Sequence, residues 1–314
     1  MTLLLQYTLL YASVLILVAL GGCFSERSGV INLGLEGIMV VGAMGGSLAM
    51  RFLYEAAPSA PGFLYFVLAV VASVALGMFY SLFLGVACIR FRADQTIIGT
   101  ALNMLATAAA VVIIKAINAG GNSGSAVVRY IEPKQHLVFK IGSFESNWFC
   151  VLTLVVLIAA YITLYKTRFG LRLMACGEHP QAADSVGINV HKMRYAGVLI
   201  SGALGGRGGI TYIVAGVSEW KFEGGVMGFG FLSLAVMIFG QWKPVRIALA
   251  ALLFGLCRAL SNTYSGISFL ADLNIGSAVY NMMPYVISLL VLAFASKKSR
   301  APKAEGIPYD KGQR

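Results

Sequence analysis

Long apolar stretches, separated by short polar connections, dominate this 314-residue chain. A hydrocarbon core about 30 Å thick requires about 20 apolar residues per helix. This window predicts nine membrane spans, near residues 3–23, 29–50, 63–89, 96–117, 148–166, 194–216, 225–242, 245–265 and 277–296. The second span begins with polar residues, so it could also be a broken or re-entrant helix. The total would then be between eight and ten spans.

Backbone amides inside lipid must find hydrogen-bond partners within their own segment, so these stretches predict an all-α fold, a polytopic transmembrane helical bundle. Glycine pairs at GxxxG spacing allow helix backbones to approach closely. The chain has such pairs at Gly42 and Gly46, Gly202 and Gly206, Gly205 and Gly209, and Gly224 and Gly228. We therefore expect tightly packed helices.

Composition and charge agree with an integral membrane protein. Hydrophobic residues make up 58% of the chain, charged residues 12%, and the net charge is +11. The basic residues occupy alternate short connections, as expected for loops that stay in the cytoplasm, rather than one face that would bind nucleic acid. They are Arg27, Arg90, Arg92, Lys166, Arg168, Arg172, Lys192, Arg194, Lys243, Arg246, Lys297, Lys298, Arg300 and Lys303. An odd number of spans then places the N-terminus outside.

No catalytic or nucleotide-binding motif is present. The chain has no GxxxxGK[ST] phosphate loop, no HExxH and no GxSxG, its three histidines lie far apart, and its five cysteines form no CxxC. We therefore expect neither an enzyme nor a metal site. The apolar stretch that ends at Cys23 lacks the basic region that a lipoprotein signal requires.

Glu36, Arg207 and Arg258 are ionisable residues that fall well inside predicted spans. A charge at the bilayer centre costs at least ~2.5 kcal/mol, so each is a candidate functional residue, with structural pairing as the alternative. A proton relay requires several acids within spans. Glu36 alone satisfies that condition, which disfavours an ion-coupled transporter.

Residues 167–194 form the longest connection on the inner side and contain a short helix signal. Pro180 suits a first helical turn and Gly187 suits a left-handed C-terminal position. Ala182 and Ala183 provide small side chains, flanked by Arg172, Glu178 and Asp184. Such a helix can dock into a groove on a partner, although an ordinary surface turn has the same signals.

Five sequence segments carry a family resemblance. FGLRLMACGEHPQAADSVGINV, ISGALGGRGG and FGFLSLAVMIFGQWKPV resemble permease subunits of bacterial ATP-binding cassette (ABC) importers for simple sugars, branched-chain amino acids and nucleosides. FSERSGVINLGLEGIMVVGA, with RADQTIIGTALNMLA, is similar to the branch that works with basic-membrane-protein-type binding lipoproteins. That branch transports nucleosides and, in some relatives, riboflavin.

The resemblance implies a permease that forms the pathway for a nucleoside or a related ribosyl or ribityl compound. A simple-sugar permease and an ion-coupled secondary transporter are the alternatives. Implied partners are a separate ABC subunit that binds ATP, a substrate-binding lipoprotein, a second permease copy or homologue, and the bilayer of the bacterial inner membrane. The permease domain would span residues 1–296, with a basic cytoplasmic tail at 297–314.

The resemblance also assigns candidate residues. The coupling helix in loop 167–194 would contact the ATP-binding subunit through Arg172, Gly177, Glu178, Pro180, Ala182, Ala183, Asp184 and Gly187. A nucleoside offers hydroxyls and a flat ring, so amides and aromatic side chains near the pathway are suitable contacts. The candidates are Asn32, Glu36, Asn103, Trp220 and Asn262. The alternatives are interhelical hydrogen bonding for the asparagines and interfacial anchoring for Trp220. Arg207 departs from the apolar residue that relatives usually have there.

Overall fold

A computed structural model describes residues 2–119, 124–130, 137–141, 144–216, 219–266, 279–280, 282–287, 289 and 301–312. Within these ranges, seven helices are long and apolar enough to cross a membrane. The all-α transmembrane bundle is thus confirmed, whereas the count of nine spans is not. The predicted span 225–242 contains an 11-residue helix, and the predicted span 277–296 lies mostly outside the described residues.

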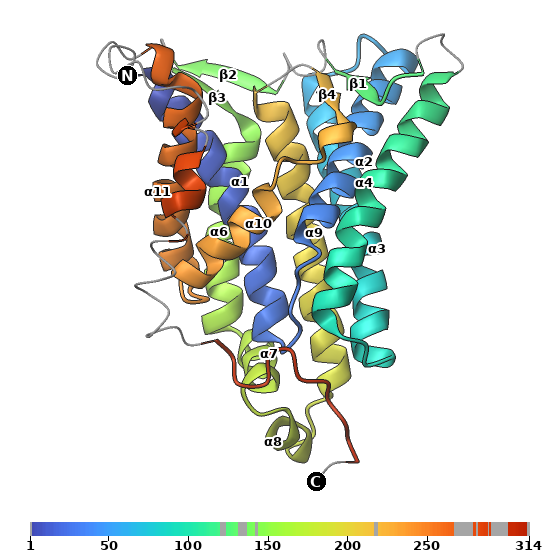
Figure 1. Ribbon diagram of the computed structural model, residues 1–314, viewed down its shortest axis with the longest axis vertical. Helices are drawn as coiled ribbons and strands as arrows, with labels where there is room; N and C mark the ends of the chain where they lie inside the picture. Colours follow the sequence, from blue (N-terminus) through green and yellow to red (C-terminus); the bar gives the residue numbers. More distant parts are fainter. Residues whose placement is uncertain are drawn as a thin grey trace.

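The seven long helices run between the two ends of the molecule (Figure 1). They are α1 (Thr2–Arg27), α2 (Leu35–Ala56), α3 (Gly62–Gly85), α4 (Gln95–Ala119), α6 (Trp148–Lys166), α9 (Val190–Gly216) and α11 (Pro244–Thr263). A π-helical turn at Val86–Arg90 extends α3. Each helix corresponds to one predicted span, with boundaries moved by a few residues.

Two short helices and the C-terminal segment lie below the bundle in Figure 1. The helices are α7 (Arg168–Glu178) and α8 (Pro180–Ser185). The basic ends of α1, α6 and α9 reach this same end, which we call the cytoplasmic end because loops rich in arginine and lysine are retained there.

The opposite, outer end contains short strands that the all-α prediction did not include. Strand β1 (Val127–Arg129) pairs antiparallel with β4 (Glu219–Lys221), and β2 (Val138–Ile141) pairs antiparallel with β3 (Phe144–Asn147). Cations at this end lie close to carboxylates. The pairs are Arg51 with Glu55, Arg129 with Glu219, and Lys115 and Lys221 with Glu223.

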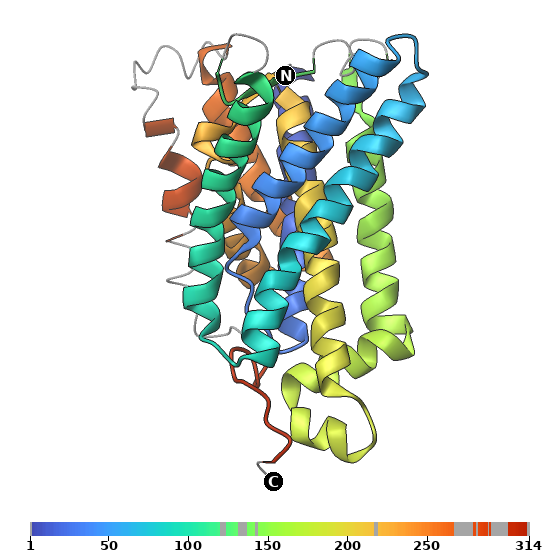
Figure 2. The ribbon, with the colours of Figure 1, turned by 90° about the vertical axis from the view of Figure 1, so that its right-hand side faces the viewer.

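Helix α9 is the centre of the bundle and packs against α1, α2 and α3 (Figure 2). Glycine makes this possible. A Cβ atom placed on Gly209 would lie 2.0 Å from the carbonyl oxygen of Met39, and one on Gly42 would lie 2.2 Å from the Cα of Gly206. The predicted close packing therefore holds for α2 against α9. It does not hold for Gly224, which has no atom within 4 Å of its Cβ position.

We predict that Gly209→Ala destabilises the protein by about 1–3 kcal/mol, because the new methyl group overlaps backbone that cannot move aside. Gly224→Ala is the matched control, since its Cβ meets open space. The measurement is the thermal unfolding midpoint of both variants in detergent, with size-exclusion chromatography as the readout of folded protein. Equal midpoints for the two variants would contradict the packing described here.

Candidate functional site

The second span is broken at its start. Helix α1 ends at Arg27 and α2 begins only at Leu35, so residues 28–34 form a non-helical connection. In Figure 1 this connection rises from the lower end of α1 into the middle of the bundle. The structure thus confirms a broken helix at FSERSGVINLGLEG, one of the two forms considered from the sequence.

Buried side chains supply the hydrogen bonds that this connection lacks. Gln95 Oε1 accepts from the amide of Ile31 at 2.6 Å, and Asn103 Nδ2 donates to the carbonyl of Leu33 at 2.8 Å. Asn103 Oδ1 also accepts from the amide of Gly37, one of the free donors in the first turn of α2, at 2.8 Å. Helix α4 therefore holds both the connection and the start of α2.

Asn32 stabilises the connection from the inside. It is fully buried, its Oδ1 accepts from the amide of Gly34 at 3.1 Å, and its Nδ2 donates to Ser201 Oγ on α9 at 2.8 Å. One side chain thus closes a local turn and fixes it to the central helix. Both polar ends of this amide are occupied by the protein.

Glu36 joins this break to a second one. Its carboxylate accepts from the amides of Gly228 at 2.8 Å and Gly230 at 2.7 Å, where α10 (Phe229–Phe239) begins. Amides at a helix N-terminus have no partner within the helix and favour a negative charge. Two interrupted segments, 28–34 and 225–228, therefore meet at Glu36.

Aromatic side chains form a column beside α10. Tyr212 packs on Phe229 with ring centres 4.2 Å apart and on Trp220 at 5.4 Å, and Tyr11 lies 5.6 Å from Phe229. The indole of Trp220 donates to the carbonyl of Gly225 at 3.0 Å. The column thus connects the outer strand β4 with the interior of the bundle.

Polar groups border this column. Asn262 Nδ2 donates to the Tyr11 hydroxyl, and the guanidinium of Arg258 lies 5.6 Å from the centre of the Phe229 ring. The side chain of Asn262 is exposed on the described structure, whereas Tyr11 and Tyr212 are buried. Flat rings beside an amide and a guanidinium can receive a heteroaromatic compound.

The five residues predicted to contact the transported substrate therefore lie in two separate places. Asn32, Glu36 and Asn103 surround the two breaks, and Trp220 and Asn262 border the aromatic column. Gln95, Tyr11 and Tyr212 belong to the same region but were not predicted. Their positions in the sequence look like ordinary span residues, and only the tertiary contacts distinguish them. For the five predicted residues, direct contact with a transported substrate stays a prediction.

Arg207 lies apart from both places. It is 3% exposed, and its Nη2 donates to the carbonyl of Phe149 on α6 at 3.5 Å. Its Nε has no hydrogen-bond partner among the described residues. Arg207 thus links α9 to α6 away from the aromatic column.

The short helix predicted in loop 167–194 is present as α8, with α7 before it. Pro180 occupies the first turn of α8, and Gly187 follows it with φ +84°, in the left-handed region that favours glycine. Thr167 caps α7 by accepting from the amide of Gly170 at 3.2 Å. Gly177 lies directly under α1, because a Cβ there would be 2.3 Å from the carbonyl oxygen of Arg27.

The two alanines of α8 do not share one face, because successive helical residues point in different directions. Ala183 is 3% exposed and packs against its own chain, whereas Ala182 is exposed. Arg172 is exposed, and Glu178 and Asp184 are partly exposed. Val186, which was not predicted, is 74% exposed at the end of α8. Single exposed apolar side chains are common on protein surfaces, so it is the position of Val186 beside the predicted contact residues, and not its exposure alone, that makes it a candidate.

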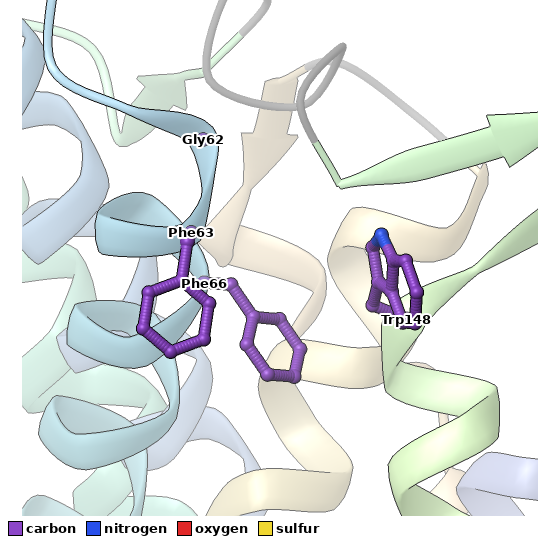
Figure 3. Close-up of a pocket in the computed structure, with 4 residues that line it drawn as sticks. All are labelled: Gly62, Phe63, Phe66 and Trp148. Carbon is purple, nitrogen blue, oxygen red and sulfur yellow. The ribbon is translucent and has the colours of Figure 1, made fainter.

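A separate hollow of about 380 Å³ lies at the outer end, between the first turns of α3 and α6. Figure 3 shows Phe63 and Phe66 facing Trp148 across it. Among the described residues, its lining consists of these rings and Gly62. Such a lining offers little to the hydroxyl groups of a sugar, so the aromatic column is the better candidate for the pathway.

Comparison with known proteins identifies relatives along almost the whole chain. The family model described as "Branched-chain amino acid transport system / permease component" matches residues 4–295. The guanosine ABC transporter permease protein NupQ of Bacillus subtilis is 40% identical, over 98% of this chain and 96% of the relative. The nucleoside ABC transporter permease protein NupC of Lactococcus lactis is 39% identical, over 97% of this chain and 96% of the relative.

A second permease from Bacillus subtilis is a more distant relative. The guanosine ABC transporter permease protein NupP is 26% identical, over 76% of this chain and 68% of the relative. The chain therefore resembles two different permeases of one bacterium to different degrees. No solved structure matches the chain significantly.

We predict that Asn103→Leu destabilises the protein, because it leaves the Leu33 carbonyl and the Gly37 amide buried without partners, at about 1–3 kcal/mol for each group. Thr100→Val is the matched control, because the Thr100 hydroxyl is exposed and bonds only within its own helix. Thermal unfolding in detergent measures both. A midpoint for Asn103→Leu equal to that of the control would show that this amide does not hold the break.

Proposed function

The chain belongs to the family of branched-chain amino acid transport system permease components, and from that membership we propose that it forms the membrane pathway of an ABC importer for nucleosides. It is a multi-pass membrane protein that transports and does not catalyse. The observation that carries the proposal is 40% identity, over nearly the whole chain, to a permease named for guanosine.

A nucleoside importer of this kind requires three partners. An ATP-binding subunit supplies the energy, since the chain has no phosphate loop of its own. A substrate-binding lipoprotein delivers the cargo to the outer end, and a second permease completes the pathway in the bacterial inner membrane. The two unequal Bacillus subtilis relatives favour a heterodimer, with this chain as the NupQ-like member.

The cytoplasmic end is suited to receive the movement of an ATP-binding subunit. Helix α8 presents Ala182 and Val186 outward, while Gly177 at the end of α7 packs on the end of α1. A displacement of α7 and α8 therefore presses on the junction between α1 and residues 28–34. Interrupted helices of this type are common where transporters bind and release their substrates.

The border of the aromatic column offers the chemistry that a nucleoside requires. The half-buried ring of Trp220 suits stacking on a nucleobase, and the exposed Asn262 supplies an amide for base edges or ribose hydroxyls. Glu36 is already saturated by the amides of α10. We therefore assign Glu36, Asn32 and Asn103 to stabilising the two helix breaks. We assign contact with the transported substrate to the residues that border the column.

We predict that the chain, reconstituted in proteoliposomes with its ATP-binding subunit, second permease and loaded binding protein, takes up guanosine and related nucleosides in the presence of ATP. Radiolabelled guanosine, uridine, riboflavin, ribose and glucose form the panel. Uptake of riboflavin or of a sugar in preference to nucleosides would overturn the substrate assignment. Gradient-driven uptake by the chain alone would overturn the ABC mechanism.

We predict that Val186→Asp abolishes ATP-dependent uptake and leaves folding intact, because it places a charge in an apolar contact while the side chain touches little of its own chain. Val186→Leu keeps the apolar contact and serves as the matched control. Co-purification of the ATP-binding subunit with each variant separates lost docking from lost transport. Normal co-purification and uptake with Val186→Asp would remove Val186 from the interface.

A further inference from the structure

The C-terminal segment 301–312 is docked along the cytoplasmic end of the bundle. Figure 1 shows it in red, running beneath the helices and beside α7. Ala304 and Tyr309 are buried, at 6% and 5% exposure, whereas Lys303 and Lys311 point to solvent. The sequence predicted a basic tail here, yet the contacts of this segment come from its backbone, its apolar side chains and two acids.

One side of the segment contacts the coupling helices. The amide of Ala304 donates to the carbonyl of Gly177, the penultimate residue of α7, at 2.8 Å. The ring of Tyr309 packs in a small apolar cluster with Cys176 of α7, Ala183 of α8 and Val190 of α9. Tyr309 thus covers the inner face of the α7–α8 unit.

A second side contacts the beginning of the broken connection. Arg194, 1% exposed on α9, donates from Nη1 to the carbonyl of Ile307 at 3.0 Å. The same guanidinium packs on Gly29, because a Cβ there would lie 2.8 Å from its Nη2. Gly306 in turn lies against Ile31. Arg194 therefore joins the C-terminal segment to residues 28–34.

The acidic residues of the segment make two further contacts. Asp310 forms a two-bond ion pair with Arg92, at 2.9 and 3.1 Å, on the connection between α3 and α4. Arg92 has φ +55°, an uncommon backbone conformation for a residue with a side chain. Burial raises the pKa of Glu305, whose carboxyl lies against Glu26 near the end of α1. A proton shared between the two carboxyls replaces their repulsion by a hydrogen bond.

We propose that residues 301–310 act as a strap that positions the α7–α8 coupling unit against residues 28–34, so that movement of α8 is delivered to the break in the second span. This inference rests on the proposed ABC function. The residues that carry it are Tyr309 and Asp310 through their side chains, and Ala304 and Ile307 through their backbones. They are positioning residues and do not contact the transported substrate.

The physical reason is that two attachments transmit displacement better than one. Without the strap, α7 still packs on α1, α6 and α9, and it meets residues 28–34 where Gly177 lies against Gly29. The strap adds a second connection from Gly177 and Ala183 to Ile31 and Arg92. It also supplies a hydrogen-bond acceptor to Arg194, a buried cation whose Nε and Nη2 have no hydrogen-bond partner among the described residues. Removal of the strap would take the Ile307 carbonyl away from this buried charge.

Cys176 provides a native reporter of strap docking. Its thiol is fully buried beneath Tyr309, and burial raises its pKa to about 11, so it reacts slowly with maleimides at neutral pH. In the full-length permease we expect Asp310→Arg to raise the rate of Cys176 labelling about fivefold, because it replaces an ion pair by a like-charge contact. Peptide mass spectrometry distinguishes Cys176 from the four other cysteines.

A charge exchange tests whether the contact itself is responsible. Arg92→Asp alone should raise labelling as Asp310→Arg does, and the double variant Arg92→Asp/Asp310→Arg should return it toward the wild-type rate. Lys303→Glu is the matched control, because it reverses an exposed charge of the same segment and leaves the ion pair intact. Labelling that is equal in all variants would overturn the strap, whatever the transported substrate.

The assembled importer tests the transmission of movement. Uptake per ATP hydrolysed should fall about threefold or more in Asp310→Arg and Tyr309→Ser, with ATP hydrolysis retained, and should recover in the exchanged pair. A strap that only supports folding would lower hydrolysis, uptake and protein yield together, and that result would overturn the positioning role. If nucleosides are not transported while Cys176 labelling follows the predicted order, the docking of the strap stands and the proposed substrate is wrong.

Discussion

Non-helical backbone inside a membrane bundle needs hydrogen-bond partners from protein or from water in a cavity, and the architecture of this permease depends on how residues 28–34 meet that condition. Side-chain amides of Asn32, Gln95 and Asn103 take the place of helical hydrogen bonds. They come from the connection itself and from α4, so the two elements cannot separate without exposing buried polar groups. Because α2 begins only after this stretch, Glu36 lies where the first amides of α10 can reach it.

The central helix α9 completes this arrangement. Its glycines bring α2 and α3 to backbone contact, while Ser201 and Arg194, about two helical turns apart, hold the unwound connection at two points. At the cytoplasmic end, Arg194 also reaches the C-terminal segment. Helix α9 therefore connects three features: the glycine-mediated packing against α2 and α3, the non-helical residues 28–34, and the region that would meet the ATP-binding subunit. A rigid element with such contacts is a suitable route for mechanical coupling.

Much of this could be predicted from the sequence because apolar length and helix-terminus signals are local. The seven long helices follow the apolar stretches, and Pro180 and Gly187 bound α8 as expected. The predicted docking face was less accurate. Ala182 and Ala183 look alike in sequence, yet only Ala182 is exposed, because Ala183 is covered by Tyr309 from more than a hundred residues away. Side-chain direction within a short helix depends on such distant partners.

The sequence by itself determined the membrane bundle, the short helix that Pro180 and Gly187 bound, and the family. Each of these follows from local composition or from contiguous motifs. Only the tertiary structure decided which polar residues are committed to the protein. Asn32, Glu36 and Asn103 read as possible substrate contacts along the chain, but in three dimensions their polar atoms meet backbone groups of residues 28–37 and 228–230, together with Ser201. Hydrogen-bond satisfaction is a property of spatial neighbours, and spacing along the chain does not contain it.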